Sequence, residues 1–291
     1  MKPSYTKPSL SYDEQTQLLK SRNLTIVNEA FSTRKLQHIN YFRLSAYFHP
    51  FYEENNSFKD SAKFEEVLQL YYFDKAFRNL IFYSIEKIEV YIRTQLAHTM
   101  AKQSGAFSYA DMDMFHDEVK HREVMNTIKS ETARSKEIFV KEYFKKYDEK
   151  YLPVWSMVEI ISFNTLSKIF ANLKEKYRRE ILQEINIKPL VFENWLHTLT
   201  YVRNICAHHS RLWNKVLAIE PKKPKNQKVF DSLNSKKIFF VIAMIIFMLE
   251  KIGDEEFNLK NEIKNLILKY SNVNLFSMGF VNDWESIELC R

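Results

Sequence analysis

The chain has 291 residues, of which 45% are hydrophobic and 27% are charged, values that are ordinary for a globular protein. Only three glycines and seven prolines occur, which disfavours turn-rich β architectures, and the absence of GxGxxG and GxxxxGK[ST] excludes the usual nucleotide-phosphate loops. The formal net charge of +7 favours anionic partners such as nucleic acid, although a lysine-rich composition alone is weak support for one.

The cysteines and the apolar runs restrict the metal sites, the location and the membrane contacts that we expect for this chain. Cys206 and Cys290 belong to no CxxC spacing, so the sequence predicts no zinc site. The opening MKPSYTKPSL lacks the apolar region of a signal peptide, which predicts a reducing, cytoplasmic location. The apolar run 238–249 has 12 residues, whereas a bilayer-spanning helix needs about 20, so we expect a buried helix and no membrane contact.

The predicted elements of the first hundred residues are helical. Ser11 is followed three residues later by Glu14, the spacing of a capping box at the start of a short helix. A rough apolar stripe over residues 32–48 predicts a second helical stretch. From Lys63 to about Gln103 apolar residues recur at intervals of three and four, which predicts one long helix that Gly105 stops.

The remaining chain also has a helical period, and no strand pattern or internal repeat is present. We expect one charged helix with loops over 107–150, one amphipathic helix over 153–173, one long helix over 190–217, an apolar helix over 236–252 and a short helix over 255–270. The sequence therefore predicts an all-α helical bundle with flanking helices. Its expected parts are an N-terminal module at 1–58, a bundle at 59–255 and a C-terminal helix and tail at 256–291.

The helix predicted over 195–216 carries two histidines on different faces. At 100° per residue one stripe is apolar and consists of Val202, Ile205, Cys206, His209, Leu212, Trp213 and Val216. A second stripe is polar and basic and consists of Asn204, His208, Arg211 and Lys215, with Arg203 on its near edge. Periodicity alone favours a partly buried core histidine at 209 and a solvated surface around 208.

The chemistry open to the polar stripe is limited by its residue types. No aspartate or glutamate lies within it, so metal-assisted hydrolysis would lack carboxylate ligands. A histidine with an ordinary pKa of about 6.5 transfers protons at neutral pH, and an arginine binds phosphate through two N–H groups. A histidine and an arginine without a metal suit cleavage of RNA, in which the 2′-OH is the nucleophile.

The stretch RNICAH, residues 203–208, resembles the R-x4-6-H signature of HEPN-superfamily ribonucleases, including an asparagine after the arginine. Three stretches, at 41–51, 202–214 and 278–285, resemble in order and spacing the landmark sequences of Abi-like abortive-infection proteins. The three stretches together are a far more specific signal than R-x4-H alone. Asn23 stands where relatives often have glycine, and this difference concerns a turn.

This resemblance implies a HEPN-type helical bundle and a metal-independent, cofactor-free endoribonuclease that acts as a toxin or phage-defence effector. It implies that His208 transfers protons, that Arg203 stabilises the phosphate and that Asn204 positions them. HEPN ribonucleases usually bring two such motifs together across a dimer. The implied partners are an RNA substrate, a second copy of the chain, and a small RNA or protein antitoxin. The alternatives are a HEPN-like module that binds RNA or protein without cutting, and a purely structural helical protein.

A second R-x4-H spacing, RTQLAH at 93–98, lies on the long helix. Thr94 replaces the asparagine, and Glu89 lies four residues before Arg93, an ordinary stabilising pair, so a structural role is favoured. Two alternatives stay open: a second half-site within one chain, or carboxylates that support the pair of residues 203 and 208. The residues concerned are Glu86, Glu89, Arg93 and His98.

Two basic segments are candidates for holding RNA. The loop EPKKPKNQK, residues 220–228, is kept extended by its prolines and could hold the RNA backbone near His208, although such loops are commonly only solvated. The run at 174–179 adds a tyrosine that could stack on a base. The candidate RNA-binding residues are His209, Arg211, Lys215, Lys222 and Lys223.

Overall fold

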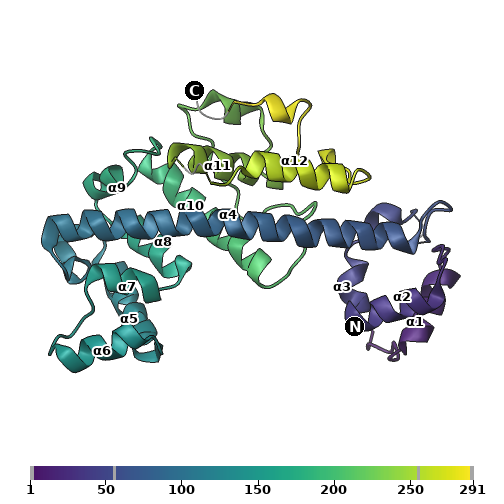
Figure 1. Cartoon of the computed structure of the whole chain (residues 1–291), viewed down its shortest axis with the longest axis horizontal. Coiled ribbons are helices and arrows are strands. Elements are labelled where there is room, and N and C mark those ends of the chain that lie inside the picture. The colour runs from purple at the N-terminus through teal and green to yellow at the C-terminus, as the bar shows by residue number, and fades with distance from the viewer. Residues whose placement is uncertain (1–2, 55–56, 254–255, 289–291) are drawn as a thin grey trace. The chain divides into compact units, whose positions relative to one another are not determined.

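The computed structural model describes residues 3–54, 57–253 and 256–288, and Cys290 lies outside them. Within these ranges the chain forms twelve α-helices and six short 3-10 turns, and its only β pairing consists of isolated bridges (Figure 1). The prediction of an all-α fold is confirmed. The contacts divide the chain into two compact units, one of residues 1–77 and 265–273, the other of residues 78–264 and 274–291.

The first unit begins with three short helices, α1 (Tyr12–Ser21), α2 (Glu29–His38) and α3 (Tyr41–Ser45). The predicted capping box is confirmed, because the Ser11 hydroxyl accepts from the Glu14 N–H at 3.2 Å and Glu14 accepts from the Ser11 N–H at 2.7 Å. Asn23 has a φ of 73°, a left-handed conformation that asparagine tolerates better than most residues. Local residues thus determine the start of α1, through Ser11 and Glu14, and the turn after it, through Asn23.

The long helix was predicted correctly within two residues at each end. It is α4 (Phe64–Ser104), and Gly105 follows with a φ of 78°. Beyond Arg78, where α4 belongs to the second unit, one face is fully buried and consists of Ile81, Ile85, Ile88, Ile92 and Leu96. Each such side chain stabilises the fold by about 1.5–3 kcal/mol relative to an exposed one.

The apolar run forms α11 (Ile238–Lys251), in which every residue from Ile238 to Leu249 is buried, as predicted. The last helix is α12 (Leu259–Lys269). Over the described part of the chain, no helix combines the length and the apolar character needed to cross a bilayer.

The middle of the chain differs from the prediction in two places. Residues 107–150 contain two helices, α5 (Glu118–Arg134) and α6 (Ile138–Lys146), rather than one. Residues 153–173 form α7 (Val154–Ile160) and α8 (Phe163–Asn172), because the backbone becomes extended at Ile161 and Ser162. The apolar period continues through this break, so periodicity alone could not detect it.

A short helix, α9 (Glu175–Ile181), leads to α10 (Pro189–Ala207), which begins with proline at its first position as predicted. Helix α8 packs against both α5 and α10 in the second unit (Figure 1). The prediction that this helix continues to residue 217 is wrong, since α10 ends ten residues earlier. This early end decides the geometry of the candidate site.

Candidate functional site

Helix α10 ends in a Schellman motif inside the RNICAHH sequence. His209 has a φ of 55°, its N–H donates to the Cys206 carbonyl at 3.0 Å, and the Ser210 N–H donates to the Ile205 carbonyl at 3.0 Å. These are the two hydrogen bonds that define this way of ending a helix with a left-handed residue. His208 is therefore the last residue before the chain leaves the helix.

Three residues of the R-x4-H motif lie at this helix end. His208 and Asn204 are exposed, and the His208 N–H donates to the Asn204 carbonyl at 3.0 Å. Arg203 is half-buried, and its guanidinium carbon lies 5.6 Å from the centre of the Phe82 ring on α4. This distance is within the range of a cation–π contact. The motif thus presents an exposed histidine and amide beside an arginine held against an aromatic ring.

Several residues beyond the helix end do not lie where an ideal helix would place them. His209 is exposed and left-handed, so the prediction of a core histidine is wrong. Val216 is 61% exposed, which also contradicts its place in the apolar stripe. Arg211 and Lys215 are half-buried and follow the helix end, so they do not continue the face of His208. All these errors have one cause, the left-handed residue that ends α10.

Leu212 and Trp213 are buried as predicted, although they do not belong to the helix. The guanidinium of Arg211 lies 6.0 Å from the centre of the Trp213 ring. The half-buried Lys215 lies next to Val216, whose backbone forms an isolated bridge with Lys237. The segment after the motif is therefore an ordered connection to α11.

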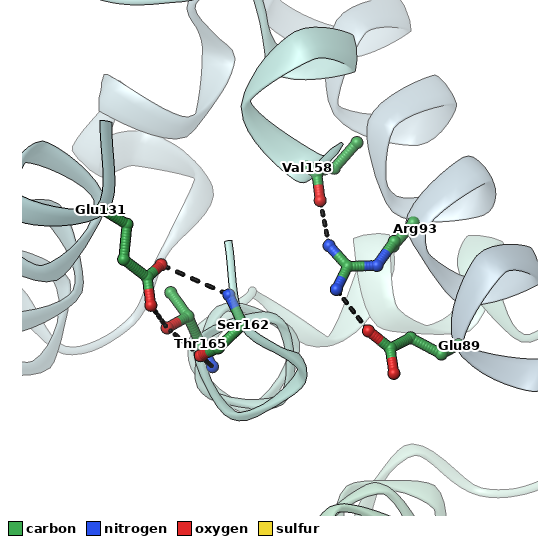
Figure 2. A network of polar contacts seen from close by, with 6 residues as sticks. All are labelled: Glu89, Arg93, Glu131, Val158, Ser162 and Thr165. Carbon is green, nitrogen blue, oxygen red and sulfur yellow. Dashed lines mark hydrogen bonds and ion pairs between the residues drawn. The ribbon is translucent and has the colours of Figure 1, made fainter. Parts of the chain in front are cut away.

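The arginine of the second R-x4-H spacing is engaged inside the fold. Arg93 donates to the carboxylate of Glu89 and to the Val158 carbonyl in the last turn of α7 (Figure 2). The side chains of Arg93 and Glu89 are only 12% and 13% exposed, and the predicted pair between them is confirmed. His98 and Glu86 are exposed on the same helix. Among the described residues, no ion pair or hydrogen bond joins Glu86, Glu89 or Arg93 to Arg203 or His208.

Two side chains of opposite charge hold the break between α7 and α8. Arg93 reaches the C-terminal end of α7, where unpaired carbonyls carry partial negative charge. At the N-terminal end of α8, Glu131 accepts from the Ser162 N–H and from the Thr165 hydroxyl, both at 3.3 Å (Figure 2). Each charge thus lies at the helix end that it stabilises. This arrangement gives Arg93 a structural task.

The lysine-rich loop after the motif is fixed to the first half of α10. The Lys222 N–H donates to the Asn194 side-chain carbonyl at 2.6 Å, and the Trp195 indole donates to the Lys222 carbonyl at 2.8 Å. Asn194 also donates to the Glu220 carbonyl at 3.2 Å. Asn194 and His208 are fourteen positions apart, or about 21 Å along a helix axis, so the structure does not bring Lys222 to His208.

Lys223 points elsewhere, because its ammonium donates to the Asp231 carbonyl at 2.8 Å. In the other basic run, Tyr177 is only 8% exposed and its ring therefore offers little surface for a base. Sequence reasoning missed Asn194 and Trp195 as anchors of the lysine loop. Nothing in the local sequence points to these hydrogen bonds, since the partners lie 26 to 28 residues apart.

The described residues hold no group of three histidine, cysteine, aspartate or glutamate side chains that could bind a metal ion. The family model described as "Abi-like protein" matches residues 34–214, which is more than half of the chain and includes the motif at the end of α10. No curated protein and no solved structure matches the chain.

Proposed function

The chain belongs to the Abi-like protein family, which is associated with abortive infection in phage defence, and we propose that it acts there as a metal-independent HEPN endoribonuclease. The observation that carries this proposal is the position of the R-x4-H motif at an exposed helix end. His208 and Asn204 face solvent there, and Arg203 is fixed by Phe82 from the neighbouring helix. An RNA phosphate can approach such a helix end without displacing a packed element.

In the proposed reaction the RNA 2′-OH attacks the adjacent phosphorus while His208 accepts its proton. The bond from phosphorus to the 5′ oxygen breaks, and that oxygen takes a proton from an imidazolium. The products are a 2′,3′-cyclic phosphate and a 5′-OH end, so no water and no metal enters the bond-breaking step. Arg203 stabilises the extra negative charge on phosphorus through its N–H donors, and Asn204 positions the pair.

We include a homodimer in the proposal, because two copies of the motif would supply one histidine as base and the other as acid. An enzyme that cuts cellular RNA also requires restraint until infection. A small RNA or a protein antitoxin would provide it, and RNA or protein that co-purifies with the chain can be identified directly.

The test is cleavage of labelled RNA by the His208→Ala variant. We expect cleavage to fall to background and cellular toxicity to disappear, with an unchanged melting temperature because the residue is exposed at a helix end. His116→Ala is the matched control, since it removes another exposed histidine away from the motif. Wild-type cleavage should continue in EDTA and leave cyclic phosphate ends. Normal cleavage by His208→Ala would refute the proposal, and tight RNA binding without any product would indicate a binding module instead.

A further inference from the structure

A groove with a volume of about 380 Å³ lies between α8 and α10. Helix α8 contributes Asn164, Ser167, Lys168 and Ala171, helix α10 contributes Leu190, Glu193, Asn194 and His197, and the lysine loop contributes Lys222. All of these residues belong to the compact unit that also contains the R-x4-H motif. Neither the motif nor the family match accounts for this groove.

The residues that line the groove carry more positive than negative charge. Within the described structure, the side chains of Lys168, Lys222 and His197 form no hydrogen bond and no ion pair. The one carboxylate among the lining residues, Glu193, is neutralised by Arg178, whose guanidinium lies 2.9 Å from it. Among the described residues, two lysines therefore line the groove without a counter-charge, which is the electrostatic requirement for binding an anion.

The position of Lys222 is set before any ligand arrives. Its N–H donates to Asn194 and its carbonyl accepts from the Trp195 indole, so its backbone is fixed and binding does not have to order a mobile loop. Lys168 extends from α8, a helix capped by Ser162 and packed against α10. The two ammonium groups thus come from two elements that are already fixed to one another.

The groove continues the same face of α10 on which His208 lies. Asn194, His197, Tyr201, Asn204 and His208 follow one another at intervals of three and four residues, which places them along one side of the helix. His197 and His208 are eleven positions apart, or about 16 Å along the axis. An RNA strand that lies along this face would meet the groove and the motif in turn.

We propose that the groove between α8 and α10 is a phosphate-binding subsite that holds the backbone of the RNA substrate a few nucleotides away from the bond cut at His208. This inference rests on the proposed function for the identity of its ligand. Lys168 and Lys222 neutralise the phosphate, and His197 and Asn164 offer hydrogen bonds to it. The subsite contacts the backbone and therefore favours longer RNA over shorter RNA without selecting a base sequence.

The test is the salt dependence of RNA binding, measured with a fluorescein-labelled single-stranded 12-mer and the full chain carrying His208→Ala, so that the RNA stays intact. Each phosphate contact contributes about 0.7 to the slope of log affinity against log salt for single strands. We expect Lys168→Gln with Lys222→Gln to reduce the slope by about 0.7, the contribution of the one phosphate that both lysines neutralise. Lys129→Gln with Lys141→Gln is the matched control, because it removes two exposed lysines of α5 and α6 and should leave the slope unchanged.

An unchanged slope in the groove variant, or no RNA binding by the chain, would overturn the subsite. Cleavage kinetics of chains that retain His208 provide a second readout. The groove variant should raise KM for the 12-mer and leave cleavage of a dinucleotide unchanged, since a dinucleotide has one internal phosphate and cannot occupy both places. Should His208→Ala cleave normally while the groove variant still loses slope, the catalytic assignment would fail and the subsite would stand.

Discussion

The two R-x4-H spacings of this chain, Arg93–His98 and Arg203–His208, have different surroundings. Arg93 lies in the interior of α4, where it bonds to Glu89 and to the end of α7. Arg203 lies just before the last turn of α10, where its described contact is a ring face, and the histidine of its motif is the C-cap of the helix. A guanidinium with a carboxylate and a carbonyl as partners stabilises the fold, whereas one held by a ring keeps its N–H donors for a ligand.

The two motifs share a spacing but differ in position, since one lies inside α4 and the other reaches the end of α10. Within α4, Arg93 is engaged by Glu89 and Val158, whereas His98 is exposed. At the end of α10 the chain turns away at His209, so solvent reaches both His208 and Asn204. Removal of each arginine in turn tests whether it contributes to RNA cleavage or to the stability of the fold.

The largest effect is expected for Arg203→Ala. Removal of one preorganised donor to a developing negative charge typically lowers the rate by about 10²- to 10³-fold, and we expect this loss in kcat/KM for RNA cleavage. The stability should fall by no more than about 1 kcal/mol, the size of a cation–π contact. Cleavage assays at saturating RNA and thermal unfolding of the same sample separate the two quantities.

Arg203→Lys is the control, since it keeps the charge but loses the paired N–H donors and should recover only part of the rate.

Mixing wild-type chains with an excess of His208→Ala chains examines the dimer. If each cut needs one histidine from each of two copies, the excess of variant chains should suppress cleavage by the wild-type chains. Cleavage that stays proportional to the amount of wild-type chain would restrict the site to one chain.

Arg93→Ala should have the opposite signature. It leaves the 13% exposed Glu89 carboxylate and the Val158 carbonyl without their donor. Breaking a buried ion pair by removing one partner costs about 3–5 kcal/mol, and we expect a value near the lower limit because both side chains retain some exposure. Urea unfolding measures this loss, and the folded fraction should cleave RNA at the wild-type rate.

The double variant Glu89→Leu with Arg93→Met is the matched control for that experiment. Replacing both charges with apolar side chains removes the stranded carboxylate and should recover much of the lost stability. A loss of cleavage with full stability in Arg93→Ala would instead support the alternative of a second half-site on α4. His98→Ala would then be expected to lose cleavage as well.

The parts of this fold that the sequence predicts are those controlled by local rules. The capping box at Ser11, the long α4 that ends at Gly105 and the buried α11 each depend on a few neighbouring residues or on one unbroken period. The break at Ile161 and Ser162 is different, because it is held by Arg93 and Glu131 from two other helices. Such tertiary bonds override a continuous apolar period and leave no trace in it.

The surroundings of the candidate site likewise depend on tertiary structure that the local sequence does not reveal. The motif residues can be identified from the sequence, but which side chains surround them depends on where α10 ends. A histidine in the left-handed conformation is uncommon, so nothing in HHSR distinguished a helix end from another helical turn. The hydrogen bonds that attach Lys222 to Asn194 and Trp195 join distant segments and required the structure.

The smallest effect is expected at His209, the left-handed residue that ends α10. His209→Gly should keep the stability within about 1 kcal/mol, because glycine adopts positive φ without steric cost. His209→Val should lose about 1–2 kcal/mol, the cost of a left-handed conformation for a side chain with a crowded β-carbon. Thermal unfolding of the two variants measures this difference.

Cleavage by the same two variants decides whether the turn or the ring matters at this position. If His209 serves the site by turning the chain and exposing His208, the glycine variant should cleave RNA nearly as fast as the wild type, and the valine variant should be slower. A glycine variant that is stable but inactive would contradict this and would assign the His209 ring to an RNA contact. An equal melting temperature for both variants would mean that the left-handed turn does not control the end of α10.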